Sequence, residues 1–287
     1  TGAGAHGIVA MSSSGGTADN SYDDPDTDSS SDYYSGGIKI EVGGQVRAEG
    51  ADTRAILAVV EETGSKDPKG NDTAHGSCRQ ADSDCRGTSH IYVDAGATVE
   101  TTNTDTKDGF ETIAVLGGRA SYNSNGSLKY SNMIWNAGTI RSASASAYVI
   151  RNRGGAIRIH NEDGGLLSGS IELDDDYRAE LNNYTGATFA AGATVDLGKL
   201  GHYSGQKGAV ISPWGAGTVG STAFSLGGSF AEAGTYQVDM AQDASSGDVT
   251  SDSIAFNGLG KTPEVSFTGK IAPNWTGKTS LANGGSG

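Results

Sequence analysis

The sequence is short of the large apolar residues that fill a globular core. Only 35% of its 287 residues are hydrophobic, and it holds six phenylalanines and five prolines. Typical soluble domains are about 45–50% apolar on a count that includes glycine, and the 45 glycines make up the difference here. No run of about 18 apolar residues occurs, so no membrane-spanning helix is predicted. The composition indicates a narrow core filled by Val, Ile, Ala and Thr.

Basic residues are also scarce. The chain has 20 Lys and Arg against 34 Asp and Glu, a formal net charge of −14. Binding to nucleic acid needs clustered Lys and Arg, so no nucleic-acid partner is expected. Unaided docking to anionic lipid is disfavoured for the same reason. The acidity is typical of an exposed surface that resists non-specific association, with divalent cation binding as the alternative.

A secretory signal, with a basic start and an apolar middle, is likewise missing from the first residues. Residues 1–6 instead resemble the middle of a repeat. We therefore expect the chain to be an excised piece of a longer protein.

What the chain has is a recurring phrase of glycine, one or two small residues, and an apolar residue. Apolar residues at alternate positions precede it, as in residues 38–42, 91–93 and 157–159. Alternation predicts half-buried strands, and the glycine predicts a corner. Gly138 and Gly165 are 27 residues apart, and Gly165 and Gly186 are 21 apart, spacings typical of solenoid coils. The sequence predicts an all-β fold, a right-handed parallel β-helix or β-solenoid. The phrase occurs at residues 43–46, 95–99, 137–140, 165–166, 186–189 and 192–195.

A second apolar phrase alternates with the first, at residues 6–10, 54–59, 111–115 and 146–150. Its uneven spacing suggests two coils per unit with variable insertions. Three insertions follow this second phrase, at residues 17–35, 64–89 and 121–131. Because equivalent positions of a solenoid stack, we expect all three loops to leave from one edge, where they either form a working surface or are merely tolerated.

The pattern changes near Leu197. Residues 1–197 are expected to form the coils with their insertions. Residues 198–287 have wider alternating runs and more aromatics, which predicts terminal coils and a C-terminal cap. A cap covers the open sheet edge at the end of a coil stack.

Three segments carry a resemblance to a known family: residues 2–10, the Ala-Gly-Ala-Thr-Val turn at residues 95–99, and the run from Gly234 to Ile254. Together they resemble the passenger domain of a bacterial autotransporter, the type V secretion family. The resemblance implies an extracellular or bacterial cell-surface location and an autochaperone-like folding core in the last 60 residues. It also implies attachment to the outer membrane through a barrel that is absent from this chain. Passengers include adhesins, proteases and esterases, so no ligand set carries over.

The two cysteines, Cys78 and Cys85, lie in one insertion. In an exported protein such a pair predicts a disulfide. The alternative is zinc, because His75 and His90 flank the pair, but the spacing matches no common zinc motif.

The first insertion contains closely spaced carboxylates that could converge on a hard cation. An EF-hand loop would need Gly at Ser29 and Glu at Ser35, so it is not one. The alternatives are a solvated acidic loop and a weak calcium site; no other cofactor is expected. The candidate calcium ligands are Asp24, Asp26, Asp28 and Asp32.

Enzyme signatures are missing, including the Gly-x-Ser-x-Gly elbow, His-Glu-x-x-His and the phosphate-binding loop. No catalytic residue is predicted. The alternative function is a β-helix polysaccharide-cleaving enzyme. Residue types for it are present at Arg158, His160, Asp174–Asp176 and His202, without the ordered motifs of such families.

Tyrosines in the insertions offer rigid contact area with a polar tip, as binding surfaces often do; the alternative is that they fold back onto the rod. We expect an adhesin or self-association protein whose partner is a host or bacterial surface protein, a glycan, or another copy of itself. The candidate binding residues are Tyr22, Tyr33, Tyr34, Tyr122 and Tyr130.

Overall fold

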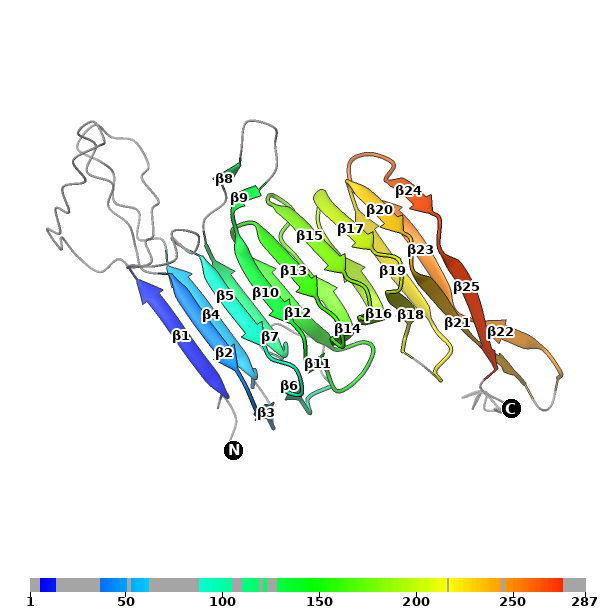
Figure 1. Ribbon diagram of the computed structural model, residues 1–287, viewed down its shortest axis with the longest axis horizontal. Helices are drawn as coiled ribbons and strands as arrows, with labels where there is room; N and C mark the ends of the chain where they lie inside the picture. Colours follow the sequence, from blue (N-terminus) through cyan, green and yellow to red (C-terminus); the bar gives the residue numbers. More distant parts are fainter. Residues whose placement is uncertain are drawn as a thin grey trace, which may run out of the picture.

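The fold is a rod of stacked β-coils, seen side-on in a computed structural model (Figure 1). The structure describes residues 6–13, 37–50, 53–61, 88–104, 110–118, 121–122, 128–215, 217–243 and 246–275. Within these ranges all regular secondary structure is strand. No helix able to cross a membrane is found in this part of the chain.

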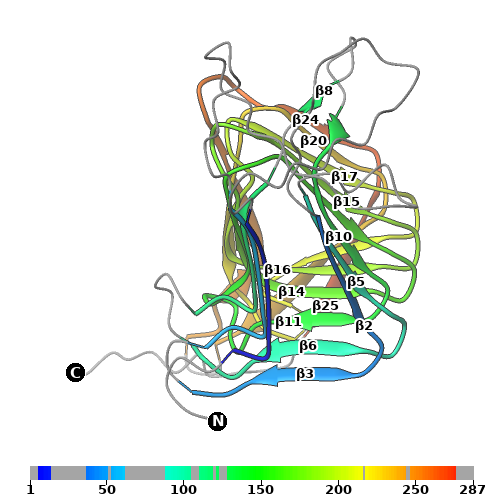
Figure 2. The ribbon, with the colours of Figure 1, turned by 90° about the vertical axis from the view of Figure 1, so that its left-hand side faces the viewer.

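The strands form three stacks, which make three sides of the rod (Figure 2). In every stack each strand pairs in parallel with the strands of the neighbouring coils. The first stack is β2 (Ile38–Val42), β5 (Ser89–Val93), β10 (Asn132–Asn136), β13 (Ile157–Asn161), β15 (Arg178–Asn183), β17 (Leu200–Gly205), β20 (Ser229–Glu232) and β24 (Glu264–Phe267). The second is β3 (Gln45–Ala48), β6 (Thr98–Thr101), β11 (Thr139–Arg141), the starts of β14 (Leu166–Glu172) and β16 (Thr188–Asp196), β18 (Val210–Pro213), β21 (Thr235–Gln242) and β25 (Lys270–Trp275). The third is β1 (Ile8–Ser13), β4 (Ile56–Glu61), β7 (Ile113–Gly117), β12 (Tyr148–Arg153), the ends of β14 and β16, β19 (Ser221–Leu226) and β23 (Ser253–Gly258).

Two short additions lie outside the stacks. The antiparallel hairpin of β8 (Ser121–Tyr122) and β9 (Leu128–Tyr130) interrupts the connection from β7 to β10. Strand β22 (Val249–Ser251) pairs antiparallel with β21. The predicted parallel β-helix is confirmed by this arrangement of parallel strands stacked in chain order.

Two details of the predicted repeat are wrong. The two apolar phrases are not separate coils: the second phrase forms strands of the third stack, while the first marks the corner between the first and second stacks. The segment 192–195 is not a corner of that kind. It lies inside β16, which runs on from the second stack to the third.

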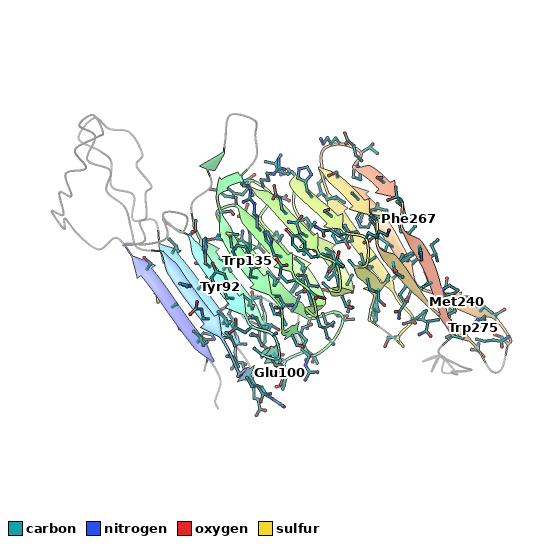
Figure 3. All side chains as sticks on the ribbon, in the orientation of Figure 1. Tyr92, Glu100, Trp135, Met240, Phe267 and Trp275 are labelled. Atoms are coloured by element: carbon teal, nitrogen blue, oxygen red, sulfur yellow. The ribbon has the colours of Figure 1, made fainter. Side chains whose placement is uncertain are left out.

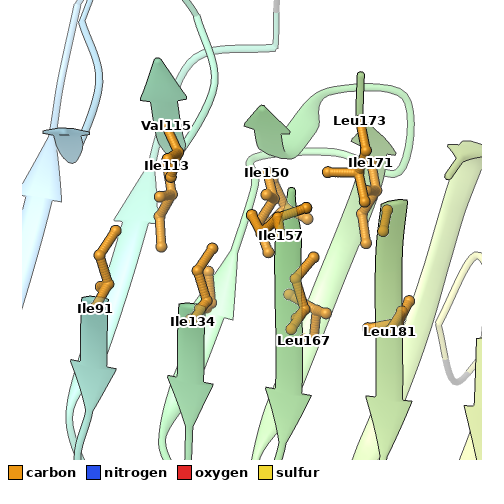
Figure 4. Packing of buried hydrophobic residues seen from close by; sticks show 14 of the residues in the cluster. Ile91, Ile113, Val115, Ile134, Ile150, Ile157, Leu167, Ile171, Leu173 and Leu181 are labelled. Carbon is orange, nitrogen blue, oxygen red and sulfur yellow. The ribbon is translucent and has the colours of Figure 1, made fainter. Parts of the chain in front are cut away.

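The core consists of rows of apolar side chains in register along the rod. Ile40, Ile91, Ile134 and Ile159 form one such row, and Ile91, Ile134 and Ile159 are fully buried. Figure 4 shows how neighbouring rows meet across the narrow interior. Alternation supplies these rows because every second side chain of a strand points inward.

The first corner of each coil depends on close backbone packing. A Cβ at Gly165 would lie 2.3 Å from the backbone oxygen of Asn136 and 2.7 Å from Oδ1 of Asn161. Glycine is therefore required there because the coil beneath leaves no space for a side chain.

A ladder of buried asparagines follows the inner side of the same corner. Nδ2 of Asn136 donates to Oδ1 of Asn161 at 2.7 Å, and Nδ2 of Asn161 donates to Oδ1 of Asn183 at 2.9 Å. The same amide groups donate to backbone oxygens, those of Asn161 and Asn183 to Thr188 and Val210. The ladder satisfies buried polar groups that would otherwise destabilise the fold.

Glu232 occupies the ladder position two coils beyond Asn183, across Gly205. Its carboxyl group is 1% exposed and accepts hydrogen bonds from the Tyr203 hydroxyl at 2.7 Å and the Gly234 amide at 2.6 Å. Burial raises the pKa of Glu232, and the hydrogen bonds from Tyr203 and Gly234 offset this only in part. The folded protein thus favours the neutral acid more than the unfolded chain does.

A Glu232→Gln variant is expected to be more stable than the wild type at pH 8 and little changed at pH 4. A raised pKa in the folded state stabilises the protein below the ordinary pKa, and this contribution is lost as the pH rises through the raised value. Glutamine keeps both hydrogen bonds without a charge. Urea unfolding at the two pH values checks this, with Glu264→Gln, an exposed carboxylate, as the control. Equal destabilisation at both values would contradict it.

A chain of alternating charges lies on the third side of the rod. Nε of Arg54 is 2.7 Å from Oε2 of Glu111, whose other oxygen is 2.9 Å from Nη1 of Arg151. Nη2 of Arg151 in turn is 2.7 Å from Oε2 of Glu172, which also pairs with Arg153. The Glu111 side chain is only 2% exposed and that of Arg151 only 6%. These charges therefore depend on one another.

The three corners differ in length. Connections from the first to the second stack contain two to four residues in every coil. Those from the third stack to the first contain two to 27, and the long ones follow β1, β4 and β7. Because these three strands pair in register, the long connections all begin at one edge of the rod.

Candidate functional site

The outer face of the first stack carries a row of aromatic rings. Tyr92, Trp135 and His160 occupy equivalent positions of β5, β10 and β13. Each lies between two inward residues, so the strand alternation that fills the core also points these rings outward. Tyr184, directly after β15, extends the row. We call these four residues the ring row; Tyr92 and Trp135 are labelled in Figure 3.

The rings stack on one another along the rod. The centroids of Tyr92 and Trp135 are 5.3 Å apart with planes 12° from parallel, and those of His160 and Tyr184 are 5.4 Å apart at 21°. Trp135 and His160 are 4.9 Å apart at 41°. Such contacts stabilise by about 0.5–1.5 kcal/mol each. Because the ring faces cover each other, mainly ring edges are left for a ligand.

Hydrogen bonds fix the orientation of the rings. Trp135 Nε1 donates to Oε1 of Glu162 at 2.9 Å. The Tyr184 hydroxyl and Nδ1 of His160 share a hydrogen bond of 3.0 Å. Burial lowers the pKa of His160, and the nearby Glu162 carboxylate opposes this effect only in part. At neutral pH the imidazole is therefore uncharged.

A shallow hollow of about 290 Å³ opens beside Tyr92 and Trp135. Its wall includes the carboxylates of Asp94 and Glu162 and the apolar side chain of Ala137. Asp94 is exposed, and the Glu162 side chain is 34% exposed. The hollow thus combines an indole edge with two hydrogen-bond acceptors that ligand donors can reach.

A charged row flanks the rings on the other side. Glu180 lies 3.0 Å from Nε of Arg158 and 2.7 Å from Nε of Arg178. Nη2 of Arg158 donates to the backbone oxygen of Leu128 at 2.7 Å, and Leu128 is 3% exposed. The β8–β9 hairpin is therefore fastened to this same face. The ring row accordingly lies on the side that the long connections rejoin at β2, β5 and β10.

The structure tests few of the residues singled out from the sequence. Tyr122 and Tyr130 lie in the β8–β9 hairpin, where their backbone alone is described. The described ranges contain no group of three or more His, Cys, Asp or Glu side chains that could hold a metal. The remaining predicted residues lie outside the described ranges, and their roles stay predictions: Tyr22, Tyr33, Tyr34, Asp24, Asp26, Asp28, Asp32, Cys78 and Cys85.

The residue types considered for polysaccharide cleavage have separate partners. Arg158 pairs with Glu180, and Nδ1 of His202 shares a 2.9 Å hydrogen bond with the Ser229 hydroxyl. Asp174 accepts hydrogen bonds from the backbone amides of Gly154 and Asp176 in the connection from β14 to β15. These contacts join the groups to structural neighbours and not to each other.

Sequence reasoning missed the ring row, although a signal was present. The tripeptides Ile91–Val93, Ile134–Asn136 and Ile159–Asn161 each place a ring between an inward isoleucine and an inward Val or Asn. Aligning these tripeptides would have superposed Tyr92, Trp135 and His160.

Comparisons with protein-family models, curated proteins and solved structures found no match for this chain. The resemblance to autotransporter passengers therefore stays a prediction based on the residues quoted for it.

Proposed function

We propose that the protein is a cell-surface or secreted binding protein of the adhesin type, an autotransporter passenger that acts without catalysis. The observation that carries this proposal is the ring row and its hollow, on the side of the rod that the long connections rejoin. The narrow β-helix serves as a rigid support, because inter-coil hydrogen bonds run along its whole length. The expected partner is a host or bacterial surface protein or glycan.

The hollow favours a ligand that donates hydrogen bonds. Stacking covers the ring faces, so a flat platform for a sugar ring is not offered between coils. Asp94 and Glu162 instead offer carboxylate oxygens beside the Trp135 edge. Hydroxyl groups and amides pair with such acceptors and gain strength from their charge. Surface glycans and polar protein loops both present these groups.

A Trp135→Ala variant is expected to bind target cells at least about tenfold more weakly than the wild type, because buried aromatic anchors dominate many interfaces. Saturation binding of the purified labelled protein to cells, and then to a glycan panel, measures this. Trp275→Ala is the matched control, since it removes an indole 59% exposed on β25 of the second stack.

Unchanged binding by the Trp135 variant would sink the ring row as the contact surface. Turnover of acidic polysaccharides, detected as new unsaturated or reducing ends, would instead favour the enzyme alternative. The separate partners of Arg158, Asp174 and His202 give that alternative less support.

A further inference from the structure

The last described coil leaves the core rows of the rod uncovered. Phe256 follows Phe224, Val265 follows Phe230, and Ile271 follows Tyr236 in register. Phe224 and Phe230 are 0% and 4% exposed, whereas Phe256, Val265 and Ile271 are 37%, 50% and 64% exposed. Phe267 and Trp275 are also exposed; both are labelled at this end of the rod in Figure 3. We call the surface formed by β23, β24 and β25 the apolar end.

The apolar end also contains a hollow of about 470 Å³, lined in part by Phe256, Pro263 and Val265. Contiguous exposed apolar surface of this kind marks an interaction site in soluble proteins. Residues 276–287 hold one large apolar side chain, Leu281, and number twelve. A coil here takes at least 21 residues, as from Ile157 to Arg178. That segment therefore cannot supply another coil.

The other end of the rod offers no matching surface. Ile38, Ile40 and Val42 of β2 begin rows of the first stack, yet they are only 3–6% exposed. The surface that complements the apolar end in extent and character is the same surface on a second copy. A contact between two identical patches closes as a two-fold dimer.

Charge favours this pairing. From Ser253 to Trp275 the chain has two lysines and one glutamate, whereas the whole protein carries −14. Two copies can therefore approach through the apolar end without the repulsion that the rest of the surface creates. Pro273 lies within β25 and has no N–H to donate. The contact is thus made chiefly by side chains, since a continuous ladder along β25 is blocked.

We propose that two copies of this chain associate end to end through β23, β24 and β25. This inference is independent of the ring row. It leaves the first stack of both copies free and places the two binding faces on one extended particle.

Sedimentation of the 287-residue chain at rising concentration tests the proposal. The wild type is expected to form a reversible dimer that high salt does not dissociate. The double variant Val265→Lys/Ile271→Lys is expected to raise the dimer dissociation constant about a hundredfold. The matched control, Val9→Lys/Met11→Lys, places the same charges on residues 50% and 61% exposed at the opposite end and should leave the dimer unchanged.

A monomeric wild type would overturn the proposal, and so would equal loss of the dimer in the control. An open-ended polymer would overturn the two-fold form, because it requires the opposite end. Protection of β25 amides in a monomer would show that residues 276–287 cover the apolar end, again against the proposal. Should the double lysine variant lose its far-ultraviolet circular dichroism, Ile271→Ser makes the same comparison with a smaller change. Cell binding by a monomeric variant separates this result from the proposed adhesin function.

Discussion

An Asn161→Leu variant is expected to unfold with a free energy about 3–5 kcal/mol lower than the wild type. The Asn161 amide is fully buried and makes three hydrogen bonds, to Asn136, Asn183 and the Thr188 backbone oxygen. Leucine has a similar size but leaves all three partners unsatisfied in the core. Each buried group without a partner costs about 1–3 kcal/mol.

Urea denaturation followed by circular dichroism measures this loss. Asn182→Leu is the matched control, because Asn182 is the same residue type on the outward side of β15. Its effect is expected to stay within about 0.5 kcal/mol. If the two variants lost the same stability, the ladder would contribute nothing beyond the core rows around it.

An Arg151→Met variant is expected to lose about 3–5 kcal/mol, because it leaves the buried Glu111 carboxylate with one cation, Arg54. Removing one partner of a buried ion pair is costly, since the remaining charge has lost its compensation. Methionine preserves much of the arginine stem, so lost packing is a minor cause. Restoring stability by adding Glu111→Gln would show that the isolated charge is responsible.

Arg47→Met provides the control for this series. The Arg47 side chain is 47% exposed and pairs with Glu49 at 2.7 Å. An exposed pair contributes about 0–1 kcal/mol, so little change is expected. A loss in Arg47→Met as large as in Arg151→Met would contradict the role of burial.

The pH dependence follows from the same carboxylate. Burial raises the pKa of Glu111, but hydrogen bonds from Arg54 and Arg151 outweigh it and hold the pKa below its ordinary value. A lowered pKa in the folded state stabilises the protein above the ordinary pKa and is lost as the pH falls through the lowered value. Acid titration of the wild type and the Arg151 variant should therefore converge at low pH.

The stacking of coils could be predicted because its cause is local. Gly138, Gly165 and Gly186 mark corners, and Ile157 and Ile159 alternate with polar residues just before one of them. Both signals act within a few residues. They do not depend on how far away the next coil lies.

Gly192 shows where the local signal fails. It opens the same phrase as Gly186, but β16 continues straight through it. A Cβ there would lie 2.3 Å from the amide nitrogen of Ser170 and 2.2 Å from the Ala145 oxygen. Close approach of a neighbouring coil, and not a corner, requires this glycine, and sequence letters do not separate the two causes.

The ring row could not be predicted from composition because its members are distant in the chain. Tyr92 and Trp135 are 43 residues apart, while Trp135 and His160 are 25 apart. Their contact depends on register, and the long connection containing β8 and β9 obscures the period. Attention to tyrosines in the insertions therefore led away from the outward positions of the strands.

The unequal corners have a consequence for redesign. The asparagine ladder holds the short corner between the first and second stacks, whereas the connection from the third stack to the first ranges from two to 27 residues. Lengthening a flexible connection costs only about 0.6 kcal/mol per doubling. Foreign peptides grafted between β12 and β13, where three residues now suffice, would be displayed in a fixed order along the rod, with a spacing set by the coils beneath them.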